Sequence, residues 1–346
     1  MRLSLIIPVR NDAEGLARLL RQLCRLLTGP EGATLAGHMA EVIVVDDASD
    51  LPAEAAIAAT GLAPALAGHL PPEGLRWLRL PAQGGAGRAR NQGLAAARGS
   101  HLLFFDSDDL PAPGFPALLA GLAVAPPFDF AMFRHADSRR LPEGVEEPIE
   151  PDAAAWQGVM PGLRAQALGG PGGWARLDAA GIDRLSRVSA YPWNKIYDAG
   201  FARRAGLRCT EIPVHNDIEL HWAGFIAAES LLASPTIGCL HFVAPEGQRL
   251  TNRRDADRLR VFEALEAVAA RLTPDRAARH APAFADFCLR LCDWIADRLE
   301  SPDARAAFEA RALAFLHRLG PPALTAALMR NPGLAGPLRR RLRRAG

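Results

Sequence analysis

Three carboxylates stand within four residues at the end of an apolar run in residues 101–110, HLLFFDSDDL. Asp106, Asp108 and Asp109 repel one another unless a positive charge lies among them. Magnesium or manganese would supply that charge, because these hard cations bind carboxylate oxygens and complete their coordination with phosphate oxygens. The spacing therefore points to a site for a divalent cation and a diphosphate. The alternative is ordinary turn chemistry, since Asp and Ser also begin turns and helices.

A second candidate for phosphate contact is the segment Gln83–Gly93, QGGAGRARNQG. Its glycines let the backbone approach a ligand closely, and Arg88 and Arg90 can neutralise phosphate charge. The segment is not the GxGxxG fingerprint of a dinucleotide site, because that motif directly follows the first strand, where this chain has PVRND. The sequence therefore argues against an NAD site.

Short apolar runs, typical of strands buried on both faces, precede these polar clusters. We predict five such strands, over 3–9, 41–45, 75–80, 101–105 and 128–134. Their alternation with helical segments predicts an α/β fold with a mostly parallel sheet flanked by helices. Ligands of such sheets bind beyond the carboxyl ends of the strands. We therefore expect Asn11-Asp12, Asp46-Asp47 and the three aspartates to lie along one edge.

The bulk composition narrows the class of protein. The 346 residues are 49% hydrophobic and 23% charged, so the chain can bury a sizeable core. A formal net charge of +2 gives no reason to expect nucleic acid as a partner. The five cysteines are scattered without a CxxC pair, which favours a reducing, cytoplasmic location. Beyond residue 255 we predict a run of helices, over 255–272, 281–300 and 302–319.

The order of the motifs resembles the nucleotide-sugar domain of family 2 glycosyltransferases, which have the GT-A fold. The resemblance rests on LSLIIPVRN, EVIVVDDASD and LPAQGGAGRARNQGLAAARGSHLLFFDSDD, and on a second block over 191–222, YPWNKIYDAGFARRAGLRCTEIPVHNDIELHW. It implies a GT-A domain over 1–252, with a donor-binding half over 1–125 and an acceptor half over 126–252. A C-terminal helical subdomain would then occupy 253–346.

The resemblance also implies a function. The enzyme would be an inverting, metal-dependent glycosyltransferase that moves a sugar from a UDP-sugar to a hydroxyl group. The acceptor would be a saccharide or a lipid-linked saccharide, in the synthesis of a surface polysaccharide or glycoconjugate. A good leaving group is already present in such a donor, so a single base with in-line attack would invert the anomeric centre.

On the donor side, the resemblance assigns residues at the ends of the strands. Those near a uracil-type base and its sugar are Pro8, Val9, Asn11 and Asp47. Arg90 takes the place of an arginine near the diphosphate, and Asp106 tends to face the ribose. Asp108 and Asp109 bind Mg²⁺ or Mn²⁺. Arg10 stands where family members often have a tyrosine, so this chain has a cation in place of a stacking surface.

On the acceptor side, the resemblance makes Asp217 the general base. Family members commonly carry Glu-Asp here, but this chain has Asn216-Asp217, and one negative charge fewer should lower the pKa of Asp217. The structural alternative is that Asn216 or Asp217 simply caps the helix beginning at Ile218. Asn216 and Trp193 are expected at the acceptor, with Trp193 stacking on a sugar or, alternatively, packing in the core. Lys195 would reach a phosphate.

Two further basic segments are candidates for contact with a ligand or a surface. The stretch 248–252, QRLTN, would close over the site, with Arg249 at the diphosphate. Near the C-terminus, Leu338 to Arg344 is basic and amphipathic, so it would either lie on an anionic membrane surface or form the solvated face of a helix.

Two other functions stay open. A nucleotidyltransferase shares the α/β sheet and an acidic metal site, but usually carries a glycine-rich loop after the first strand, which PVRND lacks. A non-catalytic nucleotide-sugar-binding protein would be consistent with the missing acid at Asn216. Retention of all three acidic clusters argues against a non-catalytic protein.

Overall fold

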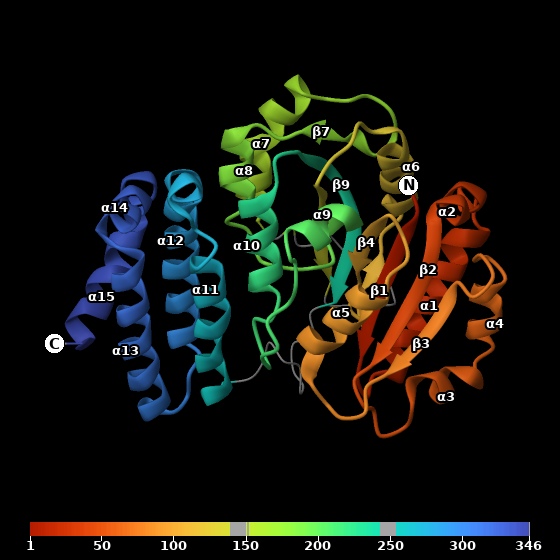
Figure 1. Ribbon diagram of the computed structural model, residues 1–346, viewed down its shortest axis with the longest axis horizontal. Coiled ribbons are helices and arrows are strands. Elements are labelled where there is room, and N and C mark those ends of the chain that lie inside the picture. The colour runs from red at the N-terminus through yellow and green to blue at the C-terminus, as the bar shows by residue number, and fades with distance from the viewer. Residues whose placement is uncertain (139–149, 151, 243–253, 346) are drawn as a thin grey trace.

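Four parallel strands form one half of a nine-stranded sheet in the computed structural model (Figure 1). The structure describes residues 1–138, 150, 152–242 and 254–345. The parallel strands lie in the order β3-β2-β1-β4, with bounds Leu75–Arg79, Met39–Asp46, Leu3–Val9 and His101–Phe104. All seven residues of β1 are buried, as expected for a strand at the centre of a covered parallel sheet.

The other half of the sheet mixes directions. β8 (Lys195–Asp198) pairs antiparallel with β4 and with β6 (Phe130–Ser138), and β9 (Leu231–Phe242) pairs parallel with β6. Two short strands, β5 (Leu110–Pro111) and β7 (Ala175–Arg176), pair antiparallel with β9. This half therefore brings the chain after β4 back to the same sheet, next to the ends of the parallel strands.

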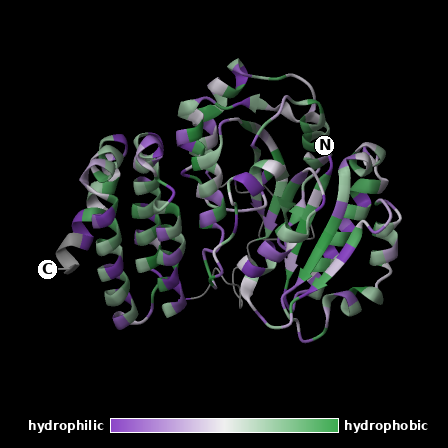
Figure 2. Ribbon diagram, viewed as in Figure 1, coloured by the Kyte–Doolittle hydropathy of each residue, from purple (hydrophilic) through white to green (hydrophobic). Residues whose placement is uncertain are grey.

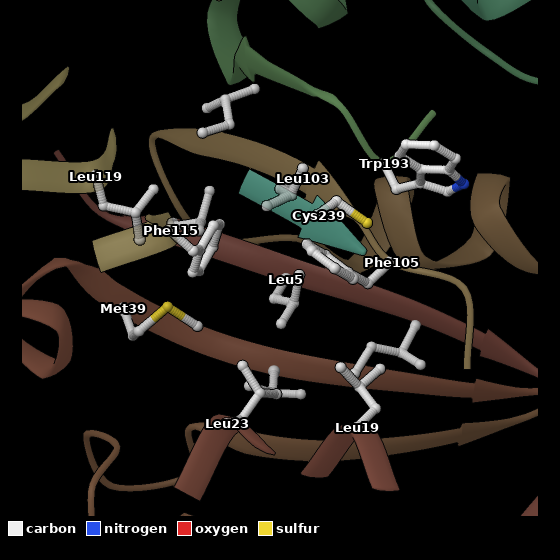
Figure 3. Close-up of a cluster of buried hydrophobic side chains, with 14 of the residues drawn as sticks. Leu5, Leu19, Leu23, Met39, Leu103, Phe105, Phe115, Leu119, Trp193 and Cys239 are labelled. Carbon is white, nitrogen blue, oxygen red and sulfur yellow. The ribbon is translucent and has the colours of Figure 1, made fainter. Parts of the chain in front are cut away.

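Helices cover both faces of the sheet because successive side chains of each strand point to opposite faces. Leu5 and Ile7 of β1 pack in a cluster with the helices of one face (Figure 3). These helices are α1 (Ala13–Thr28), α2 (Gly32–His38), α3 (Ala53–Ala58), α4 (Leu62–Ala67) and α6 (Phe115–Val124). Ile6 packs toward the other face. That face carries α5 (Gly85–Ala96), α7 (Ala153–Ala165), α8 (Ala179–Leu185), α9 (Ala199–Arg204) and α10 (Ile218–Ala227).

The C-terminal part of the chain is a bundle of helices that packs against α10 (Figure 1). Its helices are α11 (Val261–Ala269), α12 (Pro274–Ala296), α13 (Pro302–Leu319), α14 (Pro321–Arg330) and α15 (Ala335–Ala345). Their apolar faces form a core of their own, which Trp222 and Ile226 of α10 join. In Figure 2, the central strands of the sheet are mostly hydrophobic, whereas these helices alternate between polar and apolar residues.

All five predicted strands form, with ends shifted by a few residues. The sheet is mixed beyond β4, because the antiparallel partners come from distant parts of the sequence. The glycine-rich segment is helical, since α5 already begins at Gly85. The predicted domain boundary between 252 and 253 lies outside the described residues. Within the described part of the chain, no helix is both long and apolar enough to cross a bilayer.

The close packing of α5 on the sheet depends on Gly93. A Cβ atom at Gly93 would lie 2.3 Å from Cγ2 of Ile6, a buried side chain of the central strand. Gly93→Ala should therefore lower the free energy of unfolding by about 1–3 kcal/mol, the usual cost of overpacking a core. Gly37→Ala is the matched control, because a Cβ there meets nothing within 4 Å. Thermal denaturation of both variants tests this, and an equal melting temperature for the two would contradict it.

Candidate active site

Asp46 at the end of β2 organises the loop that follows it. Its carboxylate accepts hydrogen bonds from the backbone N–H of Ser49 at 2.8 Å and of Ala53 at 3.0 Å, and from Arg79 at 2.6 Å. Although burial would raise it, these hydrogen bonds lower the pKa of Asp46. All of its contacts lie within the protein, so Asp46 supports the loop and the start of α3.

Asn11, predicted to lie near a base, is held by the same loop. Its backbone is left-handed, with φ 50°, and its amide exchanges two hydrogen bonds with Asp50, of 2.9 and 3.1 Å. Pro8 and Val9 precede it at the buried carboxyl end of β1, where Val9 O accepts a hydrogen bond from Asp47 N. The structure therefore brings these residues together at one strand end, and their contact with a base stays a prediction.

Asp47 connects this strand end to the glycine-rich segment. Its two carboxylate oxygens accept hydrogen bonds from Gly84 N at 2.7 Å and Gly85 N at 2.8 Å. These N–H groups stand at the start of α5, where a negative charge is favourable because helix N-termini carry partial positive charge. Gly85 has φ +84°, a conformation that side chains disfavour. The segment needs a glycine here so that its backbone can meet Asp47.

Arg90 joins the two halves of the predicted site. Its guanidinium is 6% exposed and bonds Asp106, at the end of β4, and Oδ1 of Asn216, which precedes α10, at 2.6 Å. Because the guanidinium is planar with several donors, it can hold both partners at once. The structure thus brings together Arg90, Asp106 and Asn216, which the family resemblance places at the diphosphate, the ribose and the acceptor.

The loop of the three aspartates is fastened at both ends. Ser107 Oγ donates to Oδ2 of Asp12 at 2.7 Å, and Asp12 also caps α1 through the N–H of Gly15. On the other side, Oδ1 of Asp109 accepts a hydrogen bond of 3.1 Å from Phe242 N at the end of β9. The loop is therefore attached to α1 and to β9, and its aspartates cannot separate freely.

Asp109 is a buried carboxyl with an unsatisfied oxygen. It is 0% exposed, and its Oδ2 accepts no hydrogen bond within the described chain. Burial raises its pKa well above the usual range, and the nearby Asp108 and Asp106 raise it further. His241 opposes this effect. Although burial disfavours its charged form, Asp109 and a 3.0 Å contact with Asp137 raise the pKa of His241 to about 9.

The buried, unsatisfied oxygen of Asp109 suits a hard divalent cation, but the protein supplies only part of the ligand set. An oxygen donor set with an orphaned buried atom is what Mg²⁺ or Mn²⁺ binds, usually through one or two carboxylates plus phosphate oxygens and water. In the described part of the chain, no three His, Cys, Asp or Glu side chains converge closely enough to hold a metal ion by themselves. Asp108 and Asp109 would therefore need ligands from the substrate.

Asp217 does not cap α10. It occupies the N-cap position, but its side chain makes no capping hydrogen bond, and Asn216 bonds Arg90 instead. Neither residue therefore has the structural role that was the alternative to chemistry. Burial raises the pKa of Asp217 to about 6, with Arg90 opposing the shift. The expected effect of the amide neighbour is relative to a Glu at position 216, and it stays a prediction.

Trp193 and Lys195 lie in the interior. Trp193 is 1% exposed and stacks on Tyr191, with ring centroids 4.5 Å apart, in the core cluster of Figure 3. This is the core-packing alternative, and the ring presents little surface to a sugar. Lys195 is 0% exposed, and its ammonium bonds Tyr191 O and Asn194 Oδ1. A phosphate contact by Lys195 would therefore require movement of the surrounding residues.

Sequence reasoning assigned no role in the site to Asp137 or His241. Asp137 on β6 holds His241 on β9 beside Asp109, and no local motif links the three. The stretch 248–252 with Arg249 lies outside the described residues.

Comparison with known proteins identifies the N-terminal part of the chain. The model of Glycosyl transferase family 2 matches residues 4–145, which carry the loop of Asp47, the segment of Arg90 and the three aspartates. Residues 4–145 belong to glycosyltransferase family 2. No curated protein sequence matches the chain.

Solved structures extend the comparison to the whole chain. Residues 1–349 of S. aureus TarS in complex with UDP-GlcNAc match with a TM-score of 0.71 and 18% identity, over 100% of this chain and 89% of that one. The same fragment in complex with UDP matches with a TM-score of 0.64 and 18% identity, over the same shares. At this identity the likeness concerns the fold. The family 2 domain therefore has the GT-A fold, followed by a C-terminal helical region as in that fragment.

Proposed function

We propose that the protein is an inverting glycosyltransferase that moves a sugar from a UDP-sugar to a hydroxyl group. One observation carries this proposal: Asp217 presents a carboxyl with a raised pKa, free of any capping bond, directly beside the bridge from Asn216 through Arg90 to Asp106. A base and a diphosphate-binding arginine are the two groups that such a transfer needs from the protein. The UDP-GlcNAc and UDP bound to the S. aureus TarS fragment support the choice of a uridine donor.

The donor would bind along the strand ends. Pro8, Val9, Asn11 and Asp47 would surround the base and ribose, with Asp106 toward the ribose. Arg90 would neutralise the diphosphate, since a guanidinium bonds two phosphate oxygens at once. Asp47 contributes by fixing the first turn of α5, so that Arg90 stays in place one to two turns later.

Asp217 would accept the proton of the attacking hydroxyl. Its pKa of about 6 leaves it ionised at neutral pH yet more basic than an exposed aspartate, which suits a general base. Attack from the side opposite the leaving diphosphate inverts the anomeric centre. Arg90 holds both the loop of Asp217 and the site of the leaving group, so it sets the distance between base and diphosphate.

A divalent cation, held by Asp108 and Asp109, would neutralise the charge that develops on the diphosphate. The buried Oδ2 of Asp109 without a partner in the described chain supports this assignment. Asn216 and, after rearrangement, Trp193 would lie on the acceptor side, and Lys195 would reach a phosphate only after a similar rearrangement.

The setting we propose is the synthesis of a surface polysaccharide or glycoconjugate on a saccharide or lipid-linked acceptor, in the cytoplasm. All five cysteines are free thiols, consistent with a reducing compartment.

Contact of residues 338–344 with an anionic membrane is only weakly supported. Arg340 bonds Asp293 at 2.7 Å, and the buried Arg341 bonds Glu309 at 2.6 Å, so part of this basic charge is neutralised within the bundle.

The proposal is tested by adding a panel of nucleotide sugars, with and without Mn²⁺, and measuring the melting temperature. A ligand at about 100 times its dissociation constant stabilises the folded protein by about 2.7 kcal/mol. We expect a UDP-sugar to raise the melting temperature, more strongly with Mn²⁺, and chelation of the metal by EDTA to remove the additional rise. UDP release in the presence of saccharide acceptors then measures transfer. A chain whose melting temperature responds to none of these donors would refute the proposed function.

A further inference from the structure

His215 stands two residues before the proposed base and has an unusual backbone conformation. Its φ is 63°, in the left-handed region that residues other than glycine seldom adopt. A residue keeps such a conformation only when the contacts around it hold it in place. The partners of the His215 side chain therefore help to fix the loop that leads to Asp217.

Those partners belong to the C-terminal helical region. Nε2 of His215 lies 3.0 Å from Nη1 of Arg258, which is part of the short 3₁₀ helix Ala256–Arg260 that leads into α11. The imidazole ring also packs edge-on against Trp294 of α12, with ring centroids 5.9 Å apart. Two elements of the helical region therefore hold one side chain of the loop before α10.

Arg258 is itself held firmly as a hydrogen-bond donor. It is 1% exposed, and its guanidinium lies over the ring of Trp294, with Cζ 4.7 Å from the centroid. A guanidinium has only donors, so Nε2 of His215 accepts and the proton of the neutral ring lies on Nδ1. Burial and the positive charge of Arg258 lower the pKa of His215 to about 3, so the imidazole keeps this acceptor at neutral pH.

The loop that carries His215 also positions Asp217. Asn216 O accepts a hydrogen bond of 2.9 Å from Thr210 N, which closes residues 210–216 into a loop. Asp217 follows at the end of this loop, where α10 begins. Because its side chain makes no capping hydrogen bond, the carboxyl of Asp217 is placed by the backbone of the loop.

We propose that Arg258 is a positioning residue: through its hydrogen bond to His215, the C-terminal helical region fixes the backbone from which Asp217 reaches the acceptor hydroxyl. This inference rests on the proposed function of Asp217. The helical region thus completes the active site, in addition to forming a core of its own. A small shift of the loop is sufficient for an effect, since a misplacement of about 1 Å can cost about 100-fold in rate.

The first test compares two arginines that contact the same tryptophan. Arg258→Met in the full chain should lower kcat for sugar transfer by about 10–100-fold and leave KM for the nucleotide sugar unchanged. Arg298→Met is the matched control, because Arg298 lies over the ring of Trp294 at 4.0 Å and, within the described residues, has no hydrogen bond to His215. It should keep the parental kcat. An equal loss of kcat in both variants would overturn the proposal, since packing on Trp294 would then be the cause.

A double-mutant cycle tests whether Arg258 acts through His215. His215→Gly removes the side chain and tolerates the positive φ, so kcat should fall as it does in Arg258→Met. Adding Arg258→Met to His215→Gly should then lower kcat no further, because the hydrogen bond is already absent. Additive losses in the double variant would contradict a route through His215. His215→Gly also removes the hydrogen bond from the side of the loop, so the test remains available if Arg258→Met does not fold.

Hydrogen exchange measures the loop without turnover. Mass spectrometry of a peptide over 209–219 reports the amide of Thr210, whose bond to Asn216 closes the loop. We expect this peptide to lose protection in Arg258→Met but not in Arg298→Met, while β1 stays as protected as in the parent chain. Unchanged protection over 209–219 in Arg258→Met would overturn the inference. This measurement needs no donor, so failure of the proposed function and failure of this inference are distinguishable.

Discussion

Asp217→Asn should reduce the rate of sugar transfer by about 10²–10⁴-fold while leaving the affinity for the nucleotide sugar unchanged. The variant keeps the shape of the side chain but cannot accept a proton from the attacking hydroxyl. Donor binding is not expected to change, because Arg90 and its partners Asp106 and Asn216 remain in place. The rate is measured as acceptor-dependent UDP release, and donor affinity as the rise in melting temperature.

The same variant should be more stable than the parent chain at pH 7. The pKa of Asp217 is raised to about 6 by burial, so the folded state binds this proton more tightly than the unfolded state does. Above that pH the ionised carboxylate therefore destabilises the fold, and the penalty disappears as the pH falls toward the unfolded-state value. Asparagine carries no such penalty. An inactive variant with a higher melting temperature would exclude misfolding as the cause of inactivity.

The parent enzyme should lose activity as the pH falls through about 6, because protonated Asp217 cannot act as a base. Asp303→Asn, at an exposed position in the first turn of α13, serves as the control, with unchanged rate and pH profile. If Asp217→Asn transferred sugar at the parental rate with unchanged donor binding, the assignment of the base would be wrong, and α10 would have to be searched for another group.

The strand ends could be predicted from the sequence because their signal is local. Apolar runs such as 3–9 and 101–105 are bounded by Asn, Asp and Gly, and parallel strands place those boundaries on one edge. The hydrogen bonds between residues that lie far apart in the sequence could not be predicted. Asp47 meets Gly84 and Gly85 across 37 and 38 residues, and nothing in either segment specifies the other.

Burial determines the environments that the sequence left open. The pKa of Asp217 is raised because the surrounding protein excludes water, and the motif around it does not specify that environment. Trp193 and Lys195 stand in a motif that predicts contact with ligands, but β8 inserts between β4 and β6 and takes both into the interior. Antiparallel pairing of distant segments sets these environments, so local sequence carries little information about them.

Arg90→Ala should remove donor binding and also destabilise the fold. The buried guanidinium bonds Asp106 and Asn216, and breaking a buried pair leaves a polar group without its partner, at a cost of about 3 kcal/mol. The diphosphate would lose its main counter-charge in the protein. Nucleotide-sugar titration by melting temperature measures both effects, as a lower starting value and a lost response to donor. Arg88→Ala on the same helix is the matched control, because the side chain of Arg88 makes no hydrogen bond within the described residues, and it should retain both properties.

Arg90→Lys separates charge from geometry. Arg90 lowers the pKa of Asp217, and a lysine restores one positive charge near it, so the acid limb of transfer should stay near the parental pH. A single ammonium cannot span Asp106 and Asn216 as the planar guanidinium does. The loop of Asp217 would then be held less firmly relative to the diphosphate, and kcat should fall more than donor affinity. Full recovery of kcat in Arg90→Lys would mean that the bridge contributes only its charge.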